Sequence, residues 1–214
     1  MSNYEYIIAS LPFLTLDYKY ADGTGFGSVL DEIRRDLSDR DQASLDFLLK
    51  GFDSEALGAD FYAEALRSKD RFLREYFRFD LNLRNAKVRY LNTQLGRPLE
   101  QDVLTGKGTD DDTDLDIDLY RFHGGEFEEA PALQRVLERE DLIERERGLD
   151  DLLWQKIDSL TRFDYFNLGA VLGYVAKLHI VDRWLSLDEA AGRELFRKLV
   201  KEVRGTFKGV QYEG

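Results

Sequence analysis

Two loops of this chain carry residue types that could perform chemistry. In the first, residues 22–28, Gly23, Gly25 and Gly27 alternate ahead of Ser28. Glycines that open a helix can hold a phosphate through backbone N–H groups and the positive end of the helix dipole. The segment lacks the Gly-Lys-Ser/Thr ending of a P-loop and departs from the GxGxxG pattern, so a plain turn is the favoured interpretation.

In the second loop, residues 110–118, aspartates recur at close spacing, and hard cations such as Ca²⁺ prefer several carboxylate oxygens. An EF-hand loop that began at Asp112 would need glycine at position 117 and glutamate at position 123. The chain has Ile117 and His123 at these positions, and a start at Asp114 fails as well. A solvated acidic loop is therefore favoured over a metal site.

The remaining reactive side chains form no recognisable catalytic set. The chain has no cysteine, which removes thiolate nucleophiles and cysteine zinc sites. His179 lies beside Ile180 on an apolar stretch, where a packed histidine is favoured, and no motif singles out a pair among the 42 carboxylates. We expect no catalytic residue, no cofactor and no bound metal. An enzyme that binds a ligand or a metal through the loops 22–28 and 110–118 is the less favoured alternative.

Composition favours protein partners over nucleic acid or membranes. The 214 residues are 43% hydrophobic and 34% charged, and the net charge of −12 opposes binding to DNA, RNA and anionic lipid. The apolar run 6–16 is too short to span a bilayer, and no Lys or Arg precedes Lys19 to make a signal peptide. The lack of cysteine favours a reducing compartment. We expect a cytoplasmic protein without direct membrane insertion.

Apolar side chains recur at helical spacing along most of the chain, which predicts a mainly α fold, a bundle of about 7 helices. The longest pattern, over 59–95, predicts one continuous rod of roughly 55 Å. Residues 4–12 combine aromatic and β-branched side chains and predict a short strand or an extended N-terminal arm. The other predicted helices are 28–37, 40–50, 131–148, 149–160, 163–184 and 186–205.

Glycine and proline mark the expected ends and contacts of these helices. Gly51 is expected to end the second helix in the left-handed conformation, and Pro131 to occupy the first turn of its helix. Gly148 is expected to end that same helix. Gly169 and Gly173, four residues apart, would let another backbone approach closely.

The acidic and glycine-rich stretch 99–130 interrupts the helical pattern and predicts a linker or loop. It separates an N-terminal helical half, 1–98, from a C-terminal helical half, 131–214. A short internal repeat connects the halves, because residues 78–86 and 162–170 both contain Arg-Phe-Asp, then Asn-Leu, then Ala, with one residue inserted. Coincidence and a duplicated helical unit both explain a match of this length.

Several side chains in the predicted helices need a partner or a packing role. Arginine among apolar helix positions needs a carboxylate or the carbonyls of a helix end. The arginines so placed are Arg84, Arg89 and Arg183, and the candidate acidic partners are Asp80, Asp164 and Asp182. Core packing is favoured over an interface role for most of the aromatic residues Tyr62, Phe72, Tyr76, Phe77 and Trp184.

These segments resemble a known family. Residues 76–84 are similar to the repeated helical motif of the C subunit, also called subunit d, of V-type and A-type ATPases. Residues 172–184, which include Asp182-Arg183-Trp184, resemble a helix of that family that bears Tyr, then Lys or Glu, and ends in a charged residue and Arg. The opening 4–12 and the chain as a whole resemble a small uncharacterised bacterial family encoded alongside V-type ATPase subunits.

The resemblance implies a non-catalytic, pseudo-repeated helical protein that couples the central stalk of a V-type ATPase to the proteolipid ring of the membrane rotor. It implies a cytoplasmic location, peripheral to the inner membrane. The chain departs from the C subunit in having room for two repeats rather than three. A free-standing helical adaptor protein is the alternative. The residues given a structural role by the resemblance are Asp80, Asn82, Arg84, Asp164, Asn167, Tyr174, Arg183 and Trp184.

Overall fold

The computed structural model describes residues 2–16, 18–21, 24–104 and 129–187. Within these ranges the chain forms eight helices and no strand, which confirms the mainly α fold class. The helices are α1 (Tyr4–Ser10), α2 (Phe26–Asp36), α3 (Asp39–Lys50), α4 (Ala59–Leu66), α5 (Arg71–Gln94), α6 (Ala130–Leu137), α7 (Leu142–Thr161) and α8 (Leu168–Ser186).

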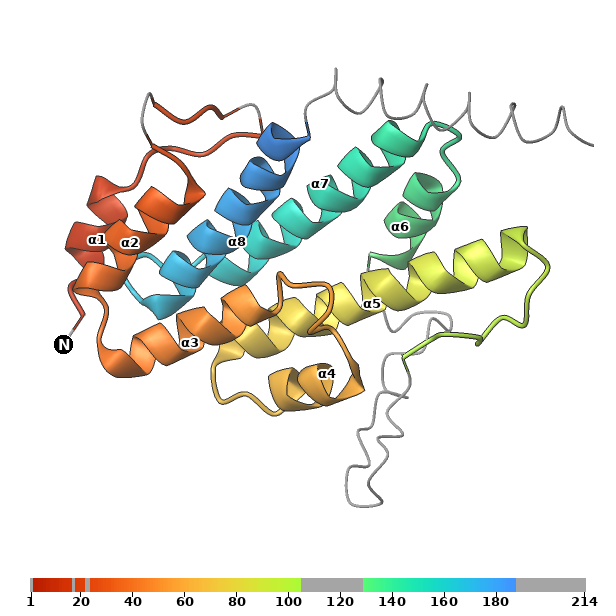
Figure 1. The fold of residues 1–214 in the computed structure, drawn as a ribbon, viewed down its shortest axis with the longest axis horizontal. Coiled ribbons are helices and arrows are strands. Elements are labelled where there is room, and N and C mark those ends of the chain that lie inside the picture. The colour runs from red at the N-terminus through yellow and green to blue at the C-terminus, as the bar shows by residue number, and fades with distance from the viewer. Residues whose placement is uncertain (1, 17, 22–23, 105–128, 188–214) are drawn as a thin grey trace, which may run out of the picture.

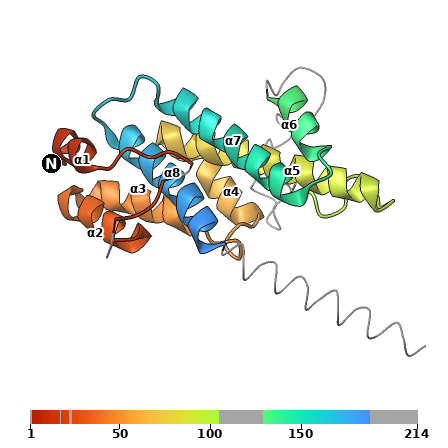
Figure 2. The ribbon, with the colours of Figure 1, turned by 90° about the horizontal axis from the view of Figure 1, so that it is seen from above.

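The three longest helices, α5, α7 and α8, pack against one another and form the frame of the molecule (Figure 1). Helices α1, α2 and α3 gather at one end and contact α8, while α4 folds back along α5. Helix α6 lies at the other end, against α5 and α7, and the second view shows the same division (Figure 2).

Buried apolar side chains form two clusters, and both have contributors from before and after the segment 105–128. The larger cluster has members from each of the helices α1–α5 and from α7 and α8. Its fully buried residues include Leu45, Tyr62, Phe77, Ile157 and Leu172. The smaller cluster lies between α5, α6 and the first half of α7, around Phe79, Leu83, Leu133, Leu137 and Leu152. Helices from the two predicted halves therefore share both cores.

The prediction of an extended arm at the N-terminus is wrong for residues 4–10, which form α1. The side chain of Asn3 caps this helix by accepting a hydrogen bond from the backbone N–H of Tyr6 at 3.2 Å. Ile7, at 2% exposure, anchors the helix in the larger core. A buried carboxylate also holds this end, because Asp41 accepts hydrogen bonds from the Tyr4 and Ser38 hydroxyls, each at 2.8 Å.

The predicted rod over 59–95 is also wrong, because two helices, α4 and α5, occupy this range. Their connection contains Ser68 and Asp70, whose short polar side chains bond to nearby backbone in place of helical bonds. Asp70 caps α5 by accepting from the N–H of Leu73 at 3.0 Å, and Arg74 donates to the carbonyl of Ser68 at 2.8 Å. Helix α5 has 24 residues and is therefore about 36 Å long.

Two glycines predicted to end helices allow close packing, and of the two only Gly51 also ends its helix, as the C-cap of α3. Gly51 follows α3 with a φ of −72°, so it is not left-handed, and a Cβ there would lie 2.3 Å from the Phe77 ring. Gly148 lies inside α7, where a Cβ would lie 2.7 Å from Val136 of α6. The helix predicted over 131–148 is consequently two helices, although Pro131 does occupy the first turn of α6 as expected.

Other helix limits shift by a few residues. Gly25 is the N-cap of α2, which starts at Phe26 instead of Ser28. The helix predicted over 163–184 begins at Leu168, and the helix predicted over 186–205 lies outside the described residues apart from Ser186 and Leu187. Side chains, not another backbone, approach Gly173 closely, since a Cβ there would lie 2.5 Å from the Thr161 Cγ2 of α7.

The first part of the predicted linker is bound to α5 by three side chains. Asn85 exchanges two hydrogen bonds with the backbone of Leu104, each of 3.0 Å. Asn92, 3% exposed, donates hydrogen bonds to the carbonyls of Leu99 and Gln101. Arg89 forms a bidentate ion pair with Glu100. Residues 99–104 therefore run back along α5. The rest of the linker up to residue 128 lies outside the described part.

Candidate functional site

Asp80, Asn82 and Arg84 lie on the part of α5 that is enclosed by other helices. The Tyr62 hydroxyl of α4 donates to the Asp80 carboxylate at 2.6 Å, and Tyr62 has no exposed surface. Burial raises the pKa of Asp80, and the Tyr62 hydrogen bond and the Arg84 charge offset part of that rise. Asn82 is 5% exposed. The hydrogen bond between Tyr62 and Asp80 therefore links α4 to α5.

Arg183 and Trp184, on α8, meet at a carboxylate that the sequence did not single out. Both donate to the same Asp150 oxygen of α7, Trp184 through its indole N–H at 2.6 Å. Asp150 is 6% exposed; burial raises its pKa, and the Arg183 charge lowers it again in part. No sequence signal distinguishes it, because Asp151 follows it directly and both lie between Leu149 and Leu152.

This finding corrects the expected partners of two arginines. Arg183 pairs with Asp150, and Arg89 pairs with Glu100, so neither uses the candidate carboxylates. Asp182, one of those candidates, instead accepts a hydrogen bond from the Tyr20 hydroxyl at 3.2 Å. Only Arg84 lies near an expected partner, Asp80.

Tyr174 and His179 of α8 contact the N-terminal half of the chain. The Tyr174 hydroxyl donates to the carbonyl of Pro12 at 3.0 Å. The His179 ring stacks on Phe52 with centroids 3.9 Å apart, and burial lowers its pKa to about 4. The expectation of a packed histidine is confirmed.

Asp164 and Asn167 lie in the connection between α7 and α8, residues 162–167, which we call the aromatic turn. Asn167 caps α8 by accepting from the N–H of Ala170 at 3.0 Å, and its amide donates to Asp164 at 2.8 Å. The N–H of Asp164 donates to the carbonyl of Thr161 at 2.9 Å. Asp164 and Asp80, which correspond in the internal repeat, therefore do not occupy equivalent places in the fold.

The other side chains of the aromatic turn are large, apolar and exposed. Phe163, Tyr165 and Phe166 are 79%, 67% and 58% exposed. The polar residues of the turn bond to one another and to the backbone, while the aromatic rings stay in solvent. Sequence reasoning missed these three residues because it placed them inside a helix. The pair Asp164 and Asn167, both favourable capping residues before an apolar run, was the available signal for a turn.

Two arginines accompany the aromatic rings: Arg162 is the first residue of the turn, and Arg71 lies beside it. The Arg162 guanidinium is 5.8 Å from the centre of the Phe163 ring. Arg71, at the start of α5, is 3.9 Å from the Asp164 carboxylate, and 63% of its side chain is exposed. Both views place the α7–α8 connection at the end of the bundle that carries α1 and α2, away from α6 (Figures 1 and 2). The turn thus combines exposed aromatic rings with two arginines, of which Arg71 is paired with Asp164.

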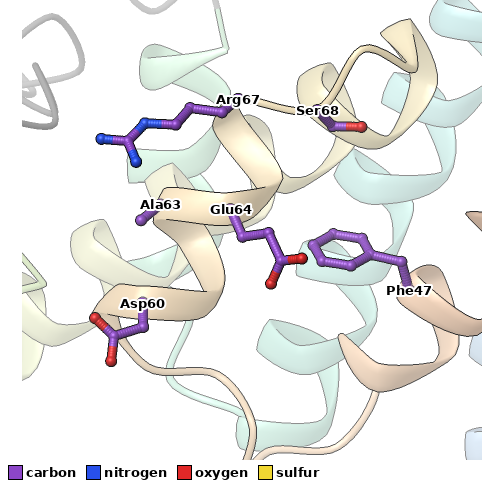
Figure 3. Close-up of a pocket in the computed structure, with 6 residues that line it drawn as sticks. All are labelled: Phe47, Asp60, Ala63, Glu64, Arg67 and Ser68. Atoms are coloured by element: carbon purple, nitrogen blue, oxygen red, sulfur yellow. The ribbon is translucent and has the colours of Figure 1, made fainter. Parts of the chain in front are cut away.

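A separate hollow of about 490 Å³ opens over α4, and its lining residues are Phe47, Asp60, Ala63, Glu64, Arg67 and Ser68 (Figure 3). Glu64 points toward the Phe47 ring, whereas Arg67 extends away from it (Figure 3). Asp60, Glu64 and Arg67 are all exposed, so water solvates their charges. Such a surface offers contacts of both signs and holds no enclosed group prepared for a reaction.

Of the two loops considered for chemistry, 110–118 lies outside the described residues, whereas residues 24–28 of the first loop are described and form the N-cap and the first turn of α2. His123 lies outside the described residues as well, and so do residues 22 and 23. Among the described residues, no group of three or more His, Cys, Asp and Glu side chains could hold a metal ion. Nor is any helix among them long and apolar enough to cross a membrane.

The described fold and its surface define an all-α bundle with buried polar braces and a fixed, exposed aromatic turn. The chain belongs to the family described as "Protein of unknown function (DUF2764)", whose model matches residues 54–206, more than half of its length. That range includes α4 to α8 and the aromatic turn. No curated protein and no solved structure matches the chain.

Proposed function

We propose that this chain is a non-catalytic structural subunit that acts by binding other proteins. The observation that carries this proposal is the aromatic turn, in which Phe163, Tyr165 and Phe166 face solvent on a hydrogen-bonded backbone. Large aromatic side chains dominate the binding energy of protein interfaces. A rigid turn also avoids much of the entropy cost of ordering a loop on binding.

The long helices suit a part that transmits force between partners. Ion pairs connect α5 with α7 through Lys87 and Glu146, and α7 with α8 through Asp158 and Lys177. The buried Asp150 adds a third link, to α8, by its bonds to Arg183 and Trp184. Links along the length of adjacent helices resist sliding of one helix past another.

The assembly that we propose is a V-type ATPase, in which the chain would couple the central stalk to the membrane rotor ring. The support is the resemblance of residues 76–84 and 172–184 to the C subunit of such enzymes. The chain would then be cytoplasmic and peripheral to the inner membrane, held there by its partners. The alternative is a free-standing helical adaptor, which the aromatic turn supports equally.

Affinity purification from the native host distinguishes these two functions. The tagged chain is purified gently, and the co-purifying proteins are identified by mass spectrometry and by co-migration with ATPase activity on a native gel. Stalk or ring subunits in a constant ratio to the chain are the expected result. Their absence, with the intact ATPase shown to be present in the same lysate, would contradict the ATPase assignment.

A further inference from the structure

The aromatic turn exposes more apolar surface than a solvated connection between helices needs. From the 79%, 67% and 58% exposure of its three aromatic residues, the exposed area amounts to roughly 400 Å². Apolar patches of this size on single proteins are often binding sites. Because two of the three residues are adjacent and the third is two positions away, the patch belongs to one short segment.

The turn is held in shape without help from these aromatic rings. Asp164 and Asn167 bond to each other, and Asn167 caps α8. Gly169 keeps room for this arrangement, since a Cβ there would lie 2.8 Å from the Asp164 carboxylate. Polar side chains thus fix the backbone and leave the rings free to contact another molecule.

The charges beside the turn indicate the chemistry of that molecule. Arg162 and Arg71 are both exposed, although the chain as a whole has a net charge of −12. Positive groups next to an apolar patch complement a partner surface in which acidic side chains surround an apolar groove. The net negative charge opposes attraction to an anionic lipid surface.

We propose that the aromatic turn docks into an apolar groove of a partner protein whose rim is acidic. Phe163, Tyr165 and Phe166 fill the groove, and Arg71 and Arg162 pair with the rim. This assignment deepens the proposed function, and its first test rests on that function because it uses the co-purifying ATPase subunits. Its second test does not depend on the identity of the partner.

The first test compares variants of the full chain in the native host. Replacing Phe163, Tyr165 and Phe166 together by serine should lower the recovery of the partner at least tenfold. The matched control, Leu142→Ser with Ile143→Ser, removes two large apolar residues that are 64% and 55% exposed on the first turn of α7, and recovery should not change. An unchanged Tm for both variants shows that the bundle remains folded.

Reversing the two positive charges tests the acidic rim separately. Arg71→Glu with Arg162→Glu should lower recovery several-fold, and the recovery of the wild type should fall with added salt while that of the variant responds less. Full recovery of the triple serine variant, or an equal loss in the Leu142 and Ile143 control, would overturn the docking site. Full recovery of the charge-reversed variant would overturn the acidic rim.

The second test places a photo-crosslinking phenylalanine analogue at position 165, with position 142 as the control. Crosslinks from position 165 to an apolar segment of another protein flanked by Asp or Glu support the proposal, even when that protein is not an ATPase subunit. In that event the ATPase assignment fails and the docking site stands. A crosslink to a second copy, to other residues of the same chain or to lipid overturns the proposal, and so does the absence of any crosslink.

Discussion

The same sequence, Arg-Phe-Asp, occurs at 78–80 and 162–164 and has opposite roles in the two places. Phe79 is 2% exposed in the smaller core, whereas Phe163 is 79% exposed in the aromatic turn. Asp80 accepts a hydrogen bond from the buried Tyr62, and Asp164 bonds to Asn167 at the start of a helix.

This difference follows from what surrounds each segment. Residues 78–80 lie in the middle of α5, which α4, α6, α7 and α8 contact, so an aromatic side chain there is enclosed. Residues 162–164 follow the last residue of α7, where the backbone turns toward α8. A short motif therefore does not determine its own burial; the elements packed around it do.

The largest contrast is expected between the two phenylalanines. Phe79→Ala should lower the free energy of unfolding by about 3–5 kcal/mol, because it removes a buried ring and leaves a cavity. Phe163→Ala should change it by less than about 0.5 kcal/mol, because the ring is already in water. Denaturation by urea, followed by circular dichroism, measures both values.

Tyr90→Ala is a useful third variant in this series, because Tyr90 is only partly buried against the smaller core and should give an intermediate loss. Equal losses for Phe79→Ala and Phe163→Ala would mean that the turn is packed in solution, which contradicts its description as an exposed surface.

A smaller contrast is expected between the two aspartates. Asp80→Ala should be less stable than Asp80→Asn by about 1–3 kcal/mol, because only asparagine keeps an acceptor for the buried Tyr62 hydroxyl. The corresponding difference between Asp164→Ala and Asp164→Asn should be below about 1 kcal/mol, because water can reach the turn. If the order of these differences is reversed, Asp80 is not the acceptor that holds α4.

The smallest expected effect is the pH dependence caused by Asp80. Its pKa is raised above 3.8 in the folded chain, mainly by burial, so the folded state binds the proton more tightly than the unfolded state. Wild type should therefore lose stability relative to Asp80→Asn as the pH rises above 3.8, by at most about 1.4 kcal/mol per pH unit. Parallel stability curves for the two proteins between pH 3 and 7 would show that the pKa is not raised.

Helical periodicity was sufficient to predict the fold class, the approximate positions of α2 and α3, and the C-terminal parts of α7 and α8. Periodicity was not sufficient to predict where one helix ends and the next begins, because the apolar spacing of 59–95 continues across Ser68 and Asp70. The side chains of these two residues accept hydrogen bonds from backbone N–H groups at the boundary between α4 and α5. The extended arm was predicted from β-branched and aromatic residues, but the Asn3 cap and the burial of Ile7 outweigh that preference.

For the site, sequence reasoning identified residues that brace the interior and missed the surface. Tyr62, Phe72, Tyr76 and Phe77 are buried as core packing predicts. The partner of Arg183 could not be predicted, since Asp150 is 33 positions away and only helix packing brings the two together. The exposure of the aromatic turn likewise depends on where α7 ends, which periodicity alone left undefined.

The position of the tryptophans has a practical consequence. The chain has only two, Trp154 and Trp184, and both lie along the contact between α7 and α8, beside Lys177 and Asp150 respectively. Intrinsic tryptophan fluorescence is therefore an optical reporter of the contact between α7 and α8. A partner that separates α7 from α8 would change the emission of both rings, and one that binds without separating them would leave the spectrum as it is.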